Sequence, residues 1–183
     1  MKKLKLLLLS AGLFLLTACG TNTSLNNPTR FDMWEYMTSS TDYKVQYRVY
    51  RNGSVDGSYI EYNRMYGDKF ERDSADGITT LFLNSATILM REPLQDVTID
   101  RYVHLKDRDI FRGDFIQSCT LENYSRNYEI KGSIFYNVLM VSCTSMSGVK
   151  EEYYYAYNEG LVAMYKNDGI DELEWIKVSE TAI

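Results

Sequence analysis

Hydrophobic and polar residues alternate along most of the chain after residue 42. The clearest case is 43–49, where Tyr43, Val45 and Tyr47 are separated by polar side chains. Alternation with a period of two is typical of a strand that buries one face. The dipeptides Asn52-Gly53 and Asp56-Gly57 favour left-handed turn positions, so this strand and the run 59–66 are predicted to form a hairpin.

Further strand-like runs follow, separated by turn signals that contain Gly, Asp or Pro, with no long helical period between them. They cover 69–72, 78–83, 87–91, 98–105, 110–119, 128–131, 134–144, 149–157, 161–166 and 173–178. Consecutive short strands of this kind indicate antiparallel meander connections. We therefore predict one all-β domain over 31–183, an antiparallel meander that forms a β-sandwich or a strongly curved sheet.

A short N-terminal helix is predicted to open this domain. Phe31, Trp34 and Met37 recur at three-residue spacing, and Thr29 is placed to cap the first turn, which contains Asp32. An irregular edge segment with the same aromatic anchors is the alternative. In either form the segment is too short to be stable alone, so it is expected to dock against the sheet.

Two of the predicted strands carry bulky residues on both faces. The runs 78–83 and 134–141 are almost continuously apolar, which is typical of strands that are covered on both sides. The cover could be a second sheet, the N-terminal helix or a ligand. A curved sheet with an apolar concave face could hold lipid, whereas a well-filled sandwich core is the simpler interpretation.

The N-terminus has the features of an export signal. Lys2, Lys3 and Lys5 precede an uncharged, Leu-rich block over 6–16, which is too short to span a bilayer as a helix. The sequence Leu16-Thr17-Ala18-Cys19 follows, and it resembles the lipobox of bacterial lipoproteins. The resemblance implies a signal peptide over 1–18 and a mature N-terminus at Cys19, whose thiol carries a diacylglyceryl group and whose amino group carries a further acyl chain such as palmitate. An ordinary signal peptide is the alternative.

The resemblance also implies a place in the cell. Several acyl chains give lasting membrane attachment, so the membrane itself is one expected partner. Gly20 follows Cys19, where an Asp would favour retention in the inner membrane, and the outer membrane is therefore favoured. Residues 19–30 are polar without periodicity and are predicted to form a flexible tether. The expected location is the bacterial cell envelope, with the domain held close to the membrane, facing either the periplasm or the cell surface.

The two remaining cysteines are predicted to form a disulfide. With Cys19 assigned to lipid, Cys119 and Cys143 are left as an even pair in an exported protein. A metal site is disfavoured because the chain has no Cys-x-x-Cys motif and a single histidine.

Charge and motif content exclude several functions. The chain has a net charge of −5 and lacks basic clusters, which argues against nucleic acid as a partner. The only histidine, His104, lies in a strand-like run, and no Gly-x-Ser-x-Gly or phosphate-binding loop is present. We therefore expect no enzyme activity and no cofactor.

A candidate binding face remains. Tyr153, Tyr155 and Tyr157 share one face of a predicted strand, where tyrosines either bind a partner or simply pack across strands. The leading hypothesis is a lipid-anchored, non-catalytic binding or assembly module with an envelope protein or lipid as partner. A lipid or lipoprotein carrier with an apolar concave sheet is the alternative. A surface adhesin, suggested by the tyrosines and by Arg112-Gly113-Asp114, is a further one.

Overall fold

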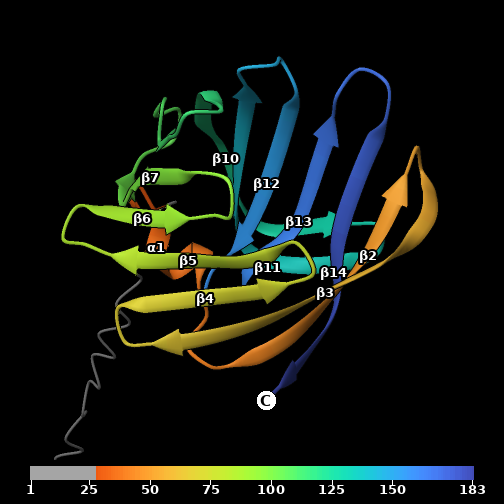
Figure 1. Ribbon diagram of the computed structural model, residues 1–183, viewed down its shortest axis with the longest axis horizontal. Helices are drawn as coiled ribbons and strands as arrows, with labels where there is room; N and C mark the ends of the chain where they lie inside the picture. Colours follow the sequence, from red (N-terminus) through yellow and green to blue (C-terminus); the bar gives the residue numbers. More distant parts are fainter. Residues whose placement is uncertain (1–27) are drawn as a thin grey trace, which may run out of the picture.

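The computed structural model describes residues 28–183, and these fold into an almost entirely β structure with one short helix (Figure 1). The elements are β1 (Phe31–Asp32), α1 (Met33–Met37), β2 (Tyr43–Arg51), β3 (Ser54–Tyr66), β4 (Lys69–Ser74), β5 (Gly77–Leu83), β6 (Thr87–Arg91), β7 (Asp96–Asp100), β8 (Tyr102–Val103), β9 (Phe111–Arg112), β10 (Ile116–Ile130), β11 (Ser133–Ser145), β12 (Lys150–Ala156), β13 (Gly160–Asn167) and β14 (Glu172–Ala182). Within these residues, no helix is long and apolar enough to cross a membrane.

Twelve of the strands form one antiparallel sheet that curls until it is nearly closed into a barrel. The order is β10-β11-β12-β13-β14-β2-β3-β4-β5-β6-β7-β9, so the chain runs as a meander except where β14 pairs with β2. The two ends of this order meet through the segment 106–110. Its backbone bonds to β10 include Lys106 N to the Leu121 carbonyl at 2.7 Å and Ile110 N to the Cys119 carbonyl at 3.2 Å. The predicted all-β meander is confirmed, as a curved sheet rather than two separate layers.

The curvature divides the barrel wall into two parts. In Figure 1 the strands β4 to β7 run crosswise to the steeply inclined β12, β13 and β14. Alternation along each strand sends one set of side chains inward, as predicted for Tyr43, Val45 and Tyr47, which are at most 2% exposed. Phe70, Leu81, Ile88, Ile99 and Leu139, each almost inaccessible to solvent, are part of the larger inner core.

The helix packs into this inner core and begins later than predicted. Phe31 and Asp32 pair with β8 as a short strand, so the helix starts at Met33. Asp32, and not Thr29, is the cap, because its carboxylate accepts a hydrogen bond from Trp34 N at 3.1 Å. Arg101 holds the same carboxylate at 2.8–3.1 Å through two guanidinium nitrogens, which joins the helix start to the barrel wall.

Several predicted strand boundaries are wrong. The strand predicted over 59–66 begins at Ser54 and includes Asp56-Gly57, which was predicted as a turn. The run 98–105 is two strands, because the chain turns at Arg101, whose N–H bonds to the Ala86 carbonyl at 3.0 Å. The run 110–119 is also interrupted, by a turn after β9. The run 128–131 is only the end of the 15-residue β10, whose polar middle has no alternation and is held as a strand by pairing with β11.

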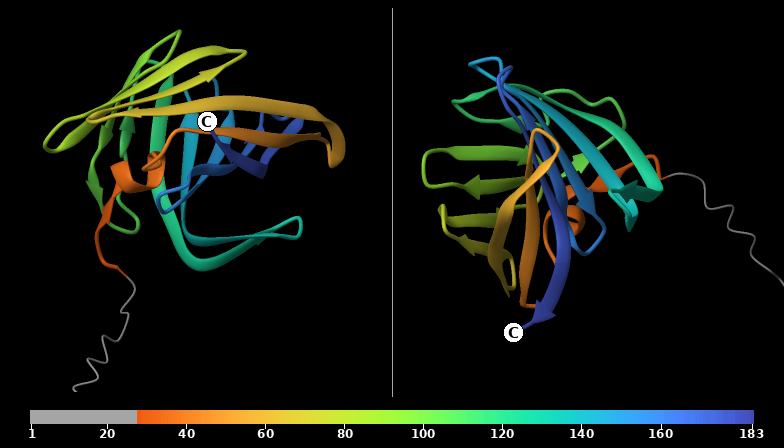
Figure 2. Two further views of the ribbon diagram at one scale, coloured as in Figure 1. Left: turned by 90° about the horizontal axis from the view of Figure 1, so that it is seen from below. Right: turned by 90° about the vertical axis from the view of Figure 1, so that its right-hand side faces the viewer.

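The hairpin of β10 and β11 is long, and its far half leaves the barrel wall. Figure 2 shows this half bent beneath the blue strands, on the outside of the sheet. Asn137 has a φ of +51° at the bend, and the register shifts between Leu121 and Asn123. The contact forms an outer core whose buried members are Phe135, Val138, Tyr154, Ala156, Val162, Ala163 and Ile176.

This outer core explains why the run 134–141 is apolar on both faces. Val138 packs outward into the outer core, whereas Leu139 and Val141 pack inward. The run 78–83 differs from the prediction, because Leu81 is buried inside while Ile78 is 54% exposed. Of the two runs, only 134–141 is therefore covered on both sides.

Candidate binding cavity

A cavity of about 500 Å³ lies on the inner face of the sheet, between the two parts of the barrel wall. Its residues come from β2 to β7, from the turns after β4 and β6, and from β9 to β14 with the turn before β10. None belongs to α1, which occupies a different part of the interior. The aromatic residues that line the cavity are Tyr47, Tyr59, Phe111, Phe115, Tyr153, Tyr155 and Trp175.

The three tyrosines of the candidate binding face lie in different environments. Tyr155 is buried at 3% exposure in the inner core, and Tyr153 stacks beside it with ring centroids 6.2 Å apart. Both line the cavity. Tyr157 follows the end of β12, is 40% exposed and contacts the ring of Tyr36 edge-on. The expectation of a single exposed tyrosine face is therefore corrected, because the sheet curls and turns this side of β12 inward.

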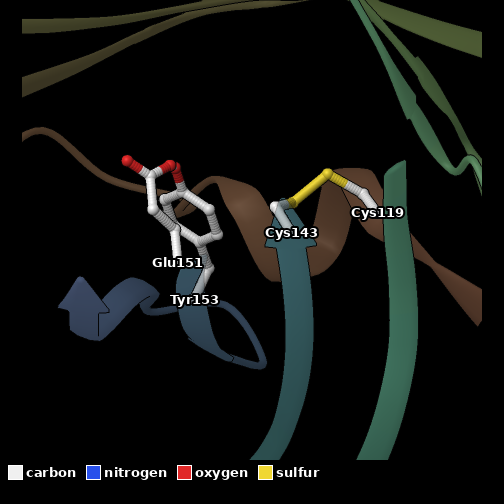
Figure 3. The surroundings of a disulfide bond; sticks show 4 residues. All are labelled: Cys119, Cys143, Glu151 and Tyr153. Carbon is white, nitrogen blue, oxygen red and sulfur yellow. A yellow bond between two sulfur atoms is a disulfide. The ribbon is translucent and has the colours of Figure 1, made fainter. Parts of the chain in front are cut away.

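The disulfide borders the same cavity. Cys119 and Cys143 are joined by a disulfide, as expected, and they lie directly opposite each other on β10 and β11. Cys119 is fully buried in the inner core, whereas Cys143 lines the cavity. Figure 3 shows Glu151 and Tyr153 on the neighbouring strand β12, on the same side of the sheet as the disulfide. The bond thus links the strand at the edge of the sheet to the strand that forms a cavity wall.

A buried carboxyl group, that of Glu61, lines the cavity. Glu61 is 8% exposed, and Tyr47 donates a hydrogen bond to its Oε2 at 3.2 Å. Burial raises the pKa of Glu61 above its ordinary value, although the positive charge of Arg72 and the hydrogen bond from Tyr47 act in the opposite direction. Burial likewise raises the pKa of Tyr47, so its hydroxyl stays protonated and acts as a donor. The same hydroxyl lies 2.9 Å from the Leu161 carbonyl.

Arg72 lies beside this carboxyl group without forming an ion pair with it. On β4 the residues Phe70, Arg72 and Ser74 alternate toward the inside, so the guanidinium is carried into the cavity. Its Nε is buried and has no hydrogen-bond partner in the described part of the chain, and Nη2 lies 3.5 Å from the sulfur of Met90. A thioether sulfur is a weak acceptor, so this guanidinium is poorly satisfied.

Other sequence candidates lie away from the cavity. His104 is exposed in the turn after β8, not in a strand, and its Nδ1 lies 3.3 Å from Asp107 Oδ2. In the tripeptide Arg112-Gly113-Asp114 the arginine is engaged by Asp100 at 2.6 and 3.0 Å. Among residues 28–183, no group of three or more His, Cys, Asp or Glu side chains is arranged to hold a metal ion. Cys19 and the rest of the lipobox precede the described residues.

The sequence patterns did not identify Glu61 and Arg72, two of the charged residues of the cavity, although a signal was present. In 69–74 the alternation that points Phe70 inward also points Arg72 inward, and an inward charge on a strand marks a functional or structural site. Glu61 and Asn63 point to the same face of β3, and both are buried. The run 59–66 has apolar residues on both faces of the strand, so the sequence did not show which face points to the interior.

Comparison with known proteins identifies the fold. A scan against models of protein families gives no match, and a search of curated proteins gives none either. Among solved structures, the chain is similar to a predicted exported protein with a YmcC-like fold from Bacteroides fragilis. The TM-score is 0.51 at 9% sequence identity, over 80% of this chain and 98% of that chain. At this identity the likeness concerns architecture alone, and it shows that the chain has a YmcC-like β fold.

Proposed function

We propose that this chain is a lipid-anchored protein of the bacterial envelope that binds a small ligand in its barrel cavity and performs no catalysis. The observation that carries the proposal is the cavity of about 500 Å³. Small-molecule sites commonly have volumes of about 300–1,000 Å³, with mostly apolar walls and a few polar groups. A module that acted only by assembling with other proteins would need no such space inside its core.

The lining supports a ligand that is apolar over most of its surface. Met90, Leu161 and Met164 join the aromatic residues on the cavity walls. Among the charged residues of the lining, Glu61 is buried, and Arg72 is half-buried with its Nε inaccessible to solvent. This composition also favours a second candidate function, the carriage of a lipid or of a lipid-modified segment, because an acyl chain needs a continuous apolar wall.

Envelope location rests on three independent features. The lipobox resemblance at Leu16-Thr17-Ala18-Cys19 implies lipid attachment, and Gly20 favours the outer membrane. The Cys119–Cys143 disulfide suits an oxidising compartment. The Bacteroides fragilis protein of the same fold is itself described as exported.

The other hypotheses receive less support. Assembly through Tyr153, Tyr155 and Tyr157 would have to use Tyr157 alone, because the first two are turned into the barrel. Adhesion through the tripeptide would compete with the ion pair between Arg112 and Asp100, in which both side chains are held by two hydrogen bonds.

Binding of the neutral apolar dye N-phenyl-1-naphthylamine tests the proposal. We expect the β domain over residues 31–183 to bind one dye molecule with a saturable rise in fluorescence. Met164→Trp should weaken this binding about tenfold or more, because Met164 lines the cavity and a larger ring removes space. Tyr165→Trp is the matched control, since the next residue on β13 points to the other face.

Two results would contradict the proposal. One is the absence of saturable binding to the wild type. The other is equal affinity of wild type, Met164→Trp and Tyr165→Trp, which would place the dye outside the cavity. Thermal melts of both variants check that each is folded at the temperature of the titration.

A further inference from the structure

Arg72 is an exception among the charged residues of the cavity. The five charged residues that line it are Glu61, Arg72, Asp76, Glu92 and Glu151. Each of the four acids already receives a hydrogen bond from within the domain. The donors are Tyr47 to Glu61 at 3.2 Å, Tyr59 to Asp76 at 2.9 Å, Gln95 to Glu92 at 3.2 Å and Tyr153 to Glu151 at 2.5 Å.

Arg72 has no comparable partner. Among the described residues its guanidinium forms no ion pair, its Nε is buried and unpaired, and its one hydrogen bond ends on the Met90 sulfur. Asn63 faces it directly across the β3–β4 pair, yet the Asn63 Oδ1 is also buried without a partner. An arginine remains charged at any physiological pH, and a charged donor left unpaired inside a protein is costly.

A ligand anion would satisfy this group. A planar carboxylate can accept two parallel hydrogen bonds from one guanidinium, which is among the strongest polar contacts in proteins. The four acids around the cavity disfavour a ligand with several negative charges. Lys166 compensates Glu151 through a contact of 3.2 Å, but within residues 28–183 no cation forms an ion pair with the other three acids. A single carboxylate is therefore favoured over a phosphate.

We propose that the cavity binds a small amphipathic monocarboxylate, with its carboxylate on Arg72 and its apolar body along Tyr155, Leu161 and Trp175. This inference rests on the proposed function and adds the chemical class of the ligand. The cavity volume of about 500 Å³ limits the ligand to a small molecule. The apolar body accounts for the aromatic walls, and the carboxylate accounts for Arg72, a charged residue of the cavity that forms no ion pair within residues 28–183.

The test compares three probes of equal length that differ only in the head group: octanoate, 1-octanol and octylamine. Isothermal titration of the wild-type domain should give the tightest binding for octanoate. Hydrogen bonds to a charged group commonly contribute enough free energy for roughly ten- to one-hundred-fold in affinity, and we expect a preference of that order over 1-octanol. Octylamine should bind most weakly, because its ammonium group would face Arg72.

Variants assign the preference to one side chain. Arg72→Gln should reduce octanoate affinity to that of 1-octanol, and Arg72→Lys should retain part of the preference. Arg64→Gln is the matched control, because Arg64 lies on the outer face of β3, where it is 39% exposed and 3.9 Å from Asp73. It should bind all three probes as the wild type does.

Several outcomes would overturn the inference. Equal binding of octanoate and 1-octanol by the wild type would do so while leaving the proposed cavity function intact, and this comparison needs no variant to fold. Tightest binding of octylamine would show that the acids dominate recognition. A preference for octanoate that survives in Arg72→Gln would place the carboxylate elsewhere. Failure of all three probes together with the neutral dye would refute both proposals.

Discussion

At the scale of single residues, the interior of this barrel is unusual for the charges that it contains. Glu61 is almost fully buried, and Arg72 borders the same space. Burial of an ionised carboxylate costs free energy unless strong partners compensate it. Here a tyrosine hydroxyl supplies the one direct hydrogen bond, and the nearby arginine supplies an attraction without an ion pair.

The buried Glu61 predicts a specific dependence of stability on pH. Its pKa in the folded state is raised above the ordinary value of 4.5, with burial as the main cause. The folded state therefore binds this proton more tightly than the unfolded state, so the free energy of unfolding falls as pH rises from the ordinary pKa through the raised one. Urea denaturation at a series of pH values rising from the ordinary pKa of 4.5 should show that Glu61→Gln has a flatter profile than the wild type.

The control for this measurement is Glu129→Gln, which changes an exposed glutamate on β10. Its profile should run parallel to that of the wild type. A Glu61→Gln profile that also runs parallel to the wild type would show that burial of this carboxyl group does not govern its titration.

The disulfide predicts a second effect at this scale. Cys119 and Cys143 close a loop with a sequence separation of 24. A crosslink over a loop of this size stabilises a protein by about 3 kcal/mol, mainly by restricting the unfolded chain. The double variant Cys119→Ser/Cys143→Ser should lose stability of about that size in urea. Addition of a reductant should lower the wild-type midpoint and leave that of the double variant unchanged. Equal midpoints for wild type and double variant would contradict the prediction.

At the scale of elements, the β10–β11 hairpin has two roles. Its near half pairs into the barrel wall and carries the disulfide, while its far half folds over the outside of β12 to β14. Tyr128 lies against Tyr154 with ring centroids 5.1 Å apart, and Lys131 pairs with Glu174 at 2.9 Å. A single ion pair that is partly exposed to solvent contributes little, so the apolar contacts of the outer core must hold the far half in place.

Two neighbouring aromatic residues test the outer core. Phe135 is 7% exposed within it, whereas Tyr136 points away and is 58% exposed. Phe135→Ala should destabilise the domain by about 3–5 kcal/mol, and Tyr136→Ala by no more than about 0.5 kcal/mol. Hydrogen exchange of the hairpin amides, measured beside denaturation, should show faster exchange in the first variant only. Small effects from both substitutions would mean that the far half is not packed.

At the scale of the whole molecule, the barrel has a helix packed in one part of its interior and a cavity in another. The chain enters the fold at β1, beside the helix. In the proposed lipid-anchored protein, the tether expected over 19–30 would join Cys19 to the domain beside the helix.

The anchor itself predicts a fractionation result. Metabolic labelling with a clickable fatty acid should mark the wild type, which should sediment with membranes, because several acyl chains hold a protein there firmly. Cys19→Ser should take no label and leave the membrane fraction, since serine cannot form the thioether. A labelled, membrane-bound Cys19→Ser protein would refute lipid attachment at this residue. Cys119→Ser/Cys143→Ser is the control and should retain the label.

The sequence by itself determined most of the local structure, and it contains the motif on which the proposed envelope location rests. Side chains alternate across a strand in any sheet, so the inward positions Tyr43, Val45 and Tyr47 could be assigned without a fold. The same reasoning gave most strands and the meander. The disulfide followed from two cysteines in an exported chain, and the lipobox is a chemical motif that is recognised as a linear sequence.

Only the tertiary structure decided what each strand face meets. Alternation shows that Tyr153 and Tyr155 share a face, but the closure of the sheet decides that this face is the interior. The same closure brings Arg72 of β4 to the cavity wall that Tyr155 of β12 forms, and no local pattern links residues so distant in sequence. The outer core likewise depends on a bend at Asn137 that lays a hairpin over strands formed later in the chain. Side-chain direction is a local property, whereas burial, an unpaired charge and a cavity arise from contacts between distant strands.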